Sequence, residues 1–394
     1  MKTLGLVAIA ASVACTACRD PAASASPTSP GSGTKSASTE VDPNAIAATD
    51  VSLQDDFGCY RGTDSIVRCW GRNSGGQVGD GTSIPDSPDT NVRATPVAVK
   101  GAPGDGALHT SPHLTWVIHA DGSVNAWGEW IVTAGAASDQ WSSLVPKRWK
   151  LPPVREIAFG SSFFCVLTVD GVVQCEGDGG RGGLGDGQSN SRATLGVATG
   201  VGKSTRLVAG DDNACALDAE GHVTCWGVAW GKDLGIDSEA PPPVSVRSGH
   251  AAPPPHPLAG PHHRVDRAPV RLDLPSAAVD IYAGFRSTCA LLRDGSVWCW
   301  SSMTSLLPDS PAPQKVACAG PVKELADGCY LQVNGDVCCG PSVIDARYDK
   351  YDLARLRGAT HLAVRLQWVC GIVKNKLRCT SDHGLDERSL FGKN

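Results

Sequence analysis

The stretch AGDDNACALDAEGHVTCWG, residues 209–227, places two cysteines ten positions apart around a glycine. A closely similar stretch, AGFRSTCALLRDGSVWCW, occupies residues 283–300 with the same cysteine spacing. If Gly221 takes the left-handed conformation at the end of a three-residue hairpin loop, Cys215 lies directly opposite Cys225. Opposite residues of an antiparallel pair are close enough for a disulfide bond. The stretch therefore predicts a β-hairpin closed by its own disulfide.

The same pattern recurs seven times, so the repeat decides the fold. The second copy keeps DGSVNAWG, residues 121–128, but has Trp116 and Ala126 in place of the two cysteines. The seventh copy is one residue shorter, which predicts a two-residue turn at Lys374 and Asn375. The other copies keep both cysteines, and the predicted bonds are Cys59–Cys69, Cys165–Cys175, Cys215–Cys225, Cys289–Cys299, Cys329–Cys339 and Cys370–Cys379.

The cysteine spacing favours disulfides over metal binding. Zinc sites use shorter spacings and four ligands per site, which this repeat does not offer. Cys318 and Cys338 fall outside the pattern, and they either bond each other or remain as free thiols or in another pairing. Structural disulfides indicate an oxidising compartment outside the cytosol.

The N-terminus resembles the export signal of a bacterial lipoprotein. A short positive region precedes an apolar run, too short to span a bilayer, that ends in SVAC at residues 12–15. We expect residues 1–14 to be the signal peptide and Cys15 to carry the lipid anchor, with Cys18 as the alternative. An ordinary cleaved signal with two spare thiols is the other interpretation. Residues 15–45 are rich in Ser, Thr, Pro, Gly and Ala, which predicts a disordered tether.

Composition narrows the classes of partner. The 394-residue chain has a formal net charge of −5 and an isoelectric point near 6.0, so no basic field favours nucleic acid. No other segment is apolar for 18 residues, so we expect membrane contact through the lipid anchor only. We expect an exported envelope lipoprotein, at the outer membrane or cell surface, that is a monomer and needs no cofactor.

The string VRCWGRNSGGQVGDGT, residues 67–82, closely resembles the repeat of the regulator of chromosome condensation family. Partial echoes follow at residues 183–187 and 233–235. The resemblance covers roughly residues 46 to 380 and implies an all-β, seven-bladed β-propeller with one blade per repeat, which we assign to residues 46–394. Founding members act on a nuclear GTPase and contact chromatin, whereas secreted bacterial propellers of this kind include one that inhibits β-lactamases with its loop face. The latter precedent implies protein binding by fold-level analogy.

A loop before the first cysteine of each repeat should lie on one rim of the propeller. These loops differ between repeats, and we single out Asp211, Asp212, Arg286 and Trp368 as a candidate binding rim. Arg286 and Trp368 are the expected anchors, because Arg and Trp dominate binding energies at interfaces. The alternative is that these rim residues are only solvated and bind no partner. Asp211 and Asp212 are sequence neighbours, which usually point apart, so they give little support to acid/base catalysis.

Two further features have structural interpretations. A Pro-rich insertion at about 239–267 contains four histidines, a composition that can bind zinc or copper, but without supporting carboxylates we expect no metal there. Those histidines are His250, His256, His262 and His263. The tryptophans of the Trp-Gly dipeptides, Trp70, Trp127 and Trp226, are expected to pack between blades rather than bind a ligand.

Two hypotheses of function follow. The first is a membrane-anchored binding module that recognises a protein or cell-envelope component through its blade loops and is not an enzyme. The alternative is a propeller hydrolase or lyase acting on an extracellular polymer. Clustered carboxylates in the central channel would favour the enzyme, and a flat mixed rim would favour the binding module.

Overall fold

The computed structural model describes residues 46–54, 56–83, 92–101, 103–131, 140–230, 263–284, 287–301, 313–318, 320–339, 351–365 and 368–381. The chain divides into two units, residues 1–43 and 44–394, and every described residue belongs to the second. The predicted signal peptide, the tether, both candidate lipid-anchor cysteines and Arg286 lie outside the described residues. Within the described part, no helix is long and apolar enough to cross a membrane.

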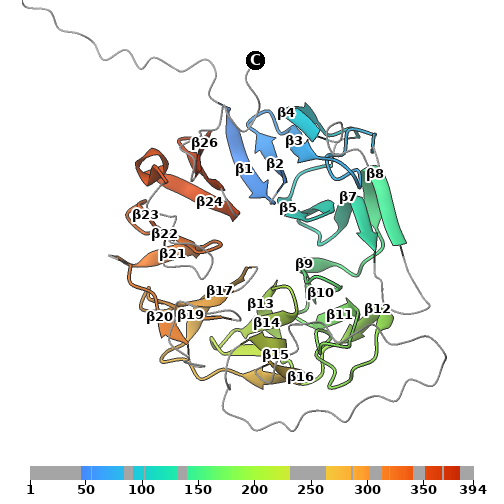
Figure 1. Ribbon diagram of the computed structural model, residues 1–394, viewed down its shortest axis with the longest axis vertical. Helices are drawn as coiled ribbons and strands as arrows, with labels where there is room; N and C mark the ends of the chain where they lie inside the picture. The colour runs from blue at the N-terminus through green and yellow to red at the C-terminus, as the bar shows by residue number, and fades with distance from the viewer. Residues whose placement is uncertain are drawn as a thin grey trace, which may run out of the picture. The chain divides into compact units, whose positions relative to one another are not determined.

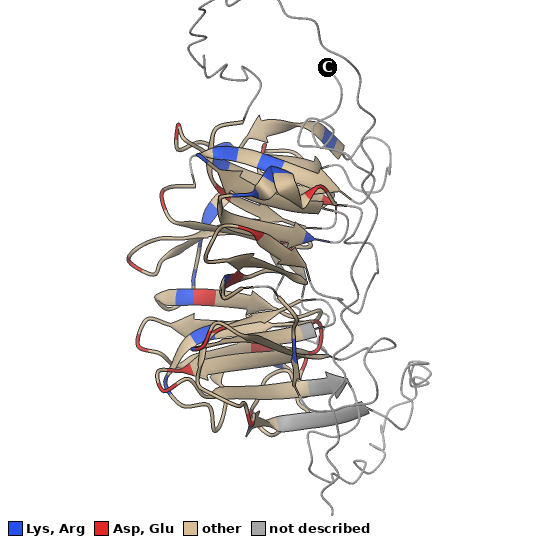
Figure 2. Cartoon of the chain, turned by 90° about the vertical axis from the view of Figure 1, so that its left-hand side faces the viewer, with Lys and Arg blue, Asp and Glu red and all other residues tan. Residues whose placement is uncertain are grey.

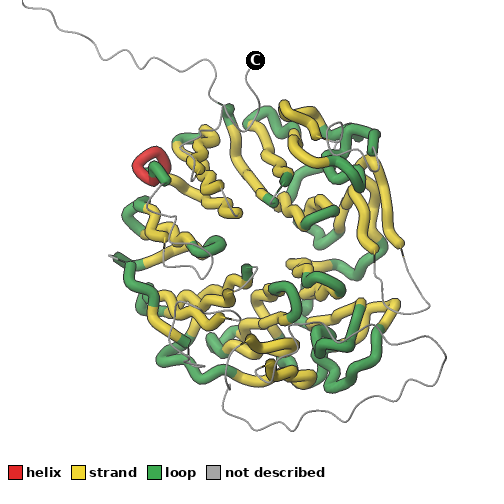
Figure 3. Tube along the Cα trace, viewed as in Figure 1, coloured by secondary structure: helices red, strands yellow, loops and turns green. Residues whose placement is uncertain are grey.

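The described strands form seven antiparallel sheets arranged in a ring, which confirms the predicted seven-bladed propeller (Figure 1). Each sequence repeat forms one blade, and the blades follow one another around the ring in chain order. The first five blades have four strands each, and the last two have three. Strands and loops make up nearly all of the described chain, with one short turn of 3₁₀ helix, η2 (Leu353–Leu356), beside the seventh blade (Figure 3).

The strands of blades one to four are β1 (Ala48–Leu53), β2 (Phe57–Gly62), β3 (Val67–Arg72) and β4 (Val92–Ala98); β5 (Ala107–Ser111), β6 (Leu114–Ile118), β7 (Val124–Ile131) and β8 (Gln140–Trp149); β9 (Val154–Phe159), β10 (Phe163–Thr168), β11 (Val173–Gly177) and β12 (Arg192–Val197); and β13 (Ser204–Ala209), β14 (Asn213–Asp218), β15 (Val223–Trp230) and β16 (His263–Arg271). Those of blades five to seven are β17 (Ala278–Ala283), β18 (Ser287–Leu292), β19 (Val297–Ser301) and β20 (Gln314–Lys315); β21 (Val322–Leu325), β22 (Cys329–Gln332) and β23 (Val337–Cys339); and β24 (Ala359–Arg365), β25 (Trp368–Val373) and β26 (Lys376–Ser381).

The hairpin between the second and third strands of each blade has the predicted register. In blade four Cys215 pairs with Cys225, and Gly221 closes the three-residue loop at a φ of 93°. The shorter seventh hairpin turns at Lys374 and Asn375, whose φ values of 50° and 60° are those that a two-residue hairpin turn requires. Turn chemistry and strand pairing therefore agree with the sequence pattern.

All six predicted cysteine pairs lie directly opposite each other and are bonded. Their Cα atoms are 4.0–4.1 Å apart. Cys318 and Cys338, left open by the sequence, also bond each other, with a Cα separation of 5.9 Å. That seventh bond ties the segment after the fifth blade to the outer strand of the sixth.

The two ends of the described chain close the ring. Ala47 forms an isolated bridge with Lys376 of β26, and the N–H of Ala48 donates to the Asn375 carbonyl over 2.9 Å. The start of the chain thus covers the free edge of the three-stranded seventh blade. Pairing of the first blade's chain with the last blade joins the two ends of the ring, which protects the outer edge of blade seven.

Tryptophans of the Trp-Gly dipeptides pack between blades, as predicted. Trp226 is buried in a cluster with residues of blade three, and its indole N–H donates to the Gly183 carbonyl over 2.9 Å. Trp127 is buried against Val78 of blade one, and Trp70 joins a cluster from blade seven. Each tryptophan therefore fills the space beside the preceding blade.

The predicted end of the insertion overlaps a strand. The Pro- and His-rich insertion was assigned to about 239–267, but β16 begins at His263. Its last five residues therefore belong to the outer strand of blade four, where they pair with β15. Residues 263–271 form the fourth strand of blade four.

Candidate functional site

The first strand of every blade lines the centre of the ring (Figure 1). In six blades the pairing of this strand with the second is interrupted by a bulge or irregularity. Only the β5–β6 pair of blade two is regular among these seven described pairs. A bulge re-aims the side chain beside it, so the same device is repeated around the channel.

Each interrupted strand places a charged or titratable residue on the channel. These residues are Asp50, Glu156, Arg206, Asp280, Glu324 and His361. In blade two, where the bulge is missing, His109 lines the channel instead. The ring therefore combines carboxylates with basic groups at one level of the channel.

Arg206 joins three consecutive blades. Its Nη1 lies 2.6 Å from Oε1 of Glu156 in blade three, and its Nε lies 2.8 Å from Oδ1 of Asp280 in blade five. Burial raises the pKa of the Glu156 carboxyl, and the Arg206 charge opposes that rise. The guanidinium thus compensates two carboxylates that would otherwise repel each other.

His361 makes a similar connection near the point of ring closure. Its Nδ1 lies 2.7 Å from Oε1 of Glu324 in blade six, and its Nε2 lies 3.9 Å from Oδ1 of Asp50 in blade one. The hydrogen bond to Glu324 raises the pKa of His361 above its ordinary value of 6.5. His361 therefore links the sixth, seventh and first blades.

The channel carboxylates also bind backbone of the next blade. Three of them accept N–H groups there: Glu156 from Leu207 over 2.5 Å, Glu324 from Leu362 over 2.9 Å, and Asp50 from Leu108 over 3.1 Å. Each carboxylate thereby ties its own blade to its neighbour. The described ring is a set of inter-blade connections, and its charges are largely compensated by one another.

The channel opens into a mouth formed by the predicted rim loops. A cavity of about 370 Å³ is lined there by Gln54, Pro112, Ser161, Asp211 and Gly284, which come from five different blades. It continues into a second cavity of about 480 Å³ at the level of the charged ring. Concave space with a few convergent polar groups is the usual form of a binding site.

His109 lies where the two cavities meet. Its imidazole stacks on Trp116, with ring centroids 5.5 Å apart. Burial lowers the pKa of His109 to about 4, so the imidazole is neutral at pH 7. Trp116 is one of the residues that replace the cysteine pair of blade two, and here it supports the channel wall.

The structure describes three of the four predicted rim residues, and these lie in different surroundings. Asp211 lines the mouth, and its carbonyl accepts the N–H of Ser161 over 2.7 Å. Asp212 is 8% exposed and pairs with Arg181, and Trp368 is half-buried against the cluster between blades seven and one. Trp368 thus packs partly within the protein and Asp212 is held by an ion pair, and their role as contact residues stays a prediction.

The charged ring was missed by sequence reasoning, although the sequence contains a signal for it. In five repeats a charged residue or His stands nine positions before the first cysteine, as Asp280 does before Cys289. The residue type varies from Asp and Glu to Arg and His, so identity matching does not find it. Only the shared register, with its bulge, makes the positions equivalent.

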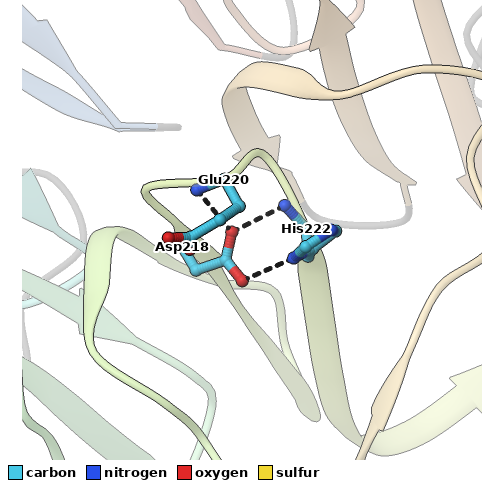
Figure 4. Close-up of side chains that lie close together, drawn as sticks. All are labelled: Asp218, Glu220 and His222. Carbon is cyan, nitrogen blue, oxygen red and sulfur yellow. Dashed lines mark hydrogen bonds and ion pairs between the residues drawn. The ribbon is translucent and has the colours of Figure 1, made fainter.

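A second polar cluster lies on the opposite face, in the hairpin loop of blade four. Asp218, Glu220 and His222 place one ligand-type atom each within 4.8 Å of one another (Figure 4). Oδ2 of Asp218 lies 2.8 Å from Nδ1 of His222, and Oδ1 accepts the backbone N–H of both other residues. These bonds close the turn, so the cluster has a structural explanation.

One known protein family matches part of this chain. The profile of the regulator of chromosome condensation (RCC1) repeat matches residues 278–305, which begin with β17 of blade five. Among curated proteins, none matches the sequence of this chain.

Solved structures show the same fold. Yeast RCC1 (Prp20), in its complex with Kap60, superposes with a TM-score of 0.58 at 15% identity, over 87% of this chain and 82% of that one. Prp20p from Saccharomyces cerevisiae gives 0.55 at 14% identity, over 86% and 83%. Human WBSCR16 gives 0.52 at 17% identity, over 70% and 69%. The chain therefore carries an RCC1 repeat and folds as a seven-bladed propeller of the RCC1 type.

Proposed function

We propose that this protein is an exported, lipid-anchored binding module that recognises a protein or other cell-envelope component at the mouth of its channel. One observation carries the proposal: loops of different chemistry, from five blades, converge on one cavity. Their frame is fixed by disulfides and by ion pairs between blades. Loops held in place lose little entropy on binding, which is the physical advantage of such a frame.

Similar structures support a protein as the partner. Yeast RCC1 was solved bound to Kap60, and Prp20p was described with its binding to Gsp1p and histones. Those partners belong to those proteins, and only the use of a propeller for protein binding is carried over. The net negative charge of this chain disfavours binding to DNA. On the side formed by blades five to seven, acidic and basic residues are interspersed (Figure 2).

Binding is favoured over the alternative of a polymer-cleaving enzyme. Carboxylates do gather in the channel, as a hydrolase would need, but Glu156 and Asp280 share Arg206, and Glu324 pairs with His361. General acid/base catalysis needs a group free to exchange its proton with substrate. The described carboxylates instead hold adjacent blades together.

A matched pair of variants tests the proposed face. Ser161 is exposed at the mouth, and Glu220 is exposed on the opposite face. Ser161→Trp should block the mouth and reduce the amount of a specific partner captured from envelope extract by at least about tenfold, whereas Glu220→Trp should not change it. Capture that survives Ser161→Trp but is lost with Glu220→Trp would contradict the assignment of the mouth.

The anchor is tested separately. We expect Cys15→Ser to abolish lipid labelling and to move the protein from the membrane fraction to the soluble fraction, since acylation supplies the only proposed membrane contact. Cys18→Ser should leave labelling unchanged. Labelling that persists until Cys18 is replaced would show that the anchor site was misassigned.

A further inference from the structure

The interface between blades two and three is packed differently from those that hold a Trp-Gly tryptophan. At three other interfaces a buried Trp-Gly tryptophan fills the space beside the preceding blade, as Trp70, Trp127 and Trp226 do. Blade three has Glu176 at that position. In blade two the third strand continues past Gly128 into the long pair β7–β8, where blade one has the loop that contains Val78. Both halves of the usual contact are thus replaced at the same interface.

A cavity of about 490 Å³ lies there. Its walls include Trp130, Trp141, Trp149, Phe164 and Leu195. The aromatic rings support one another: the centroids of Trp141 and Trp149 are 5.7 Å apart, and those of Trp149 and Phe164 are 5.3 Å apart. Trp130 and Trp141 are only half-buried, so aromatic surface remains accessible on a wall that packing holds in place.

Basic side chains surround this aromatic wall. Lys147, Arg148 and Lys150 line the cavity and are exposed, and the acidic residue among its lining side chains is Glu176. The local excess of positive charge stands out in a chain whose formal net charge is −5. Exposed cations beside a concave aromatic surface favour a ligand that combines an anionic group with an apolar face.

We propose that this cavity binds an acidic saccharide unit. A pyranose ring presents C–H groups on its face that pack against indole, and its carboxylate or sulfate pairs with Lys or Arg. Glu176 and the exposed Thr194 offer oxygens to the sugar hydroxyls. The planes of Trp141 and Trp149 are inclined by 33° and their centroids are too close to admit a flat ring between them, which disfavours a sandwiched nucleobase.

Calorimetric titration of the full chain tests this site. The acidic probes are tri-galacturonate and a hyaluronan tetrasaccharide, with galactotriose and chitotetraose as neutral counterparts and AMP as a nucleotide. The variants are Trp141→Ala and Lys147→Gln. Their matched controls are Trp300→Ala, at a half-buried tryptophan of blade five, and Lys203→Gln, at an exposed lysine away from the cavity.

At least one acidic probe should bind, and its neutral counterpart should bind at least about tenfold more weakly. Trp141→Ala should weaken the acidic probe by about tenfold or more, and Lys147→Gln by about fivefold with a smaller salt dependence. Both controls should bind as the unmodified protein does. Failure of both acidic probes, equal binding of the neutral sugars, preference for AMP, or equal losses in the control variants would overturn the proposal.

Discussion

Arg206 and His361 show how single residues hold this ring together. Each lies within ion-pair distance of carboxylates that come from two other blades. Ion pairs with one exposed partner usually contribute little. Here the Glu156 carboxylate also accepts a backbone N–H, and its side chain is four-fifths shielded from solvent. Removing its Arg206 partner would therefore leave a shielded charge unpaired, which costs free energy of folding.

We expect Arg206→Met to destabilise the protein by about 1–3 kcal/mol, below the cost of breaking a fully buried pair because Arg206 is partly exposed. Thermal unfolding measures the change. Adding Glu156→Gln to this variant should recover part of the loss, since the unpaired charge is then removed. If Arg206→Met unfolds at the same temperature as the unmodified protein, the ring does not connect the blades energetically.

The raised pKa of His361 predicts a dependence of stability on pH. A histidine whose folded-state pKa is raised contributes stability that is complete below its unfolded pKa of about 6.5 and is lost as pH rises through the folded value. The melting temperature of the unmodified protein should therefore exceed that of His361→Gln at pH 6. The difference should shrink above neutral pH. A difference that is constant between pH 6 and 8 would show that His361 is not charged in the folded protein.

At the scale of the elements, the hairpin is the part that sequence predicts best. Ten-residue cysteine spacing, a glycine before the third strand and period-two alternation all act within about twenty residues, so local geometry determines the register. The bulged first strands could not be predicted in this way. Their bulges depend on how each strand meets its neighbours around the channel, and the β5–β6 pair of blade two has none. The packing of Trp368 could not be predicted for the same reason, because its neighbours include residues of blade one.

Packing between blades gives a prediction with an internal contrast. Trp226→Ala removes a fully buried ring and its hydrogen bond to Gly183, and should cost about 3–5 kcal/mol. Trp141→Ala removes a half-buried ring beside an open cavity and should cost clearly less. Denaturant unfolding of both variants measures the difference. Equal costs would mean that the cavity between blades two and three is packed as firmly as the other interfaces.

The whole molecule depends on closure between its first and last blades. Ala48 is fully buried and donates its N–H to Asn375, so Ala48→Pro removes this bond and adds atoms to a filled space. We expect a loss of at least about 2 kcal/mol. Hydrogen exchange should show faster opening of β25 and β26 than of blade four. Uniform exchange across the blades, with unchanged stability, would mean that the chain start does not close the ring.

For the whole molecule, the proposed binding function requires loops of different chemistry on one face. The frame that holds them must have the same geometry in every blade. The loops at the mouth reach it only because every hairpin has the same register and every first strand ends at the same rim. A different pairing of the cysteines would move the loops apart and remove the mouth. The register is therefore the premise on which the binding proposal rests.

Peptide mapping of the unreduced protein tests that premise most directly. The expected bonds are Cys59–Cys69, Cys165–Cys175, Cys215–Cys225, Cys289–Cys299, Cys329–Cys339 and Cys370–Cys379, with Cys318–Cys338 as the seventh. Each of the six hairpin bonds should be recovered within a single repeat. Bonds that join cysteines of different repeats, in place of these six, would contradict the hairpin register and with it the propeller that presents the loops.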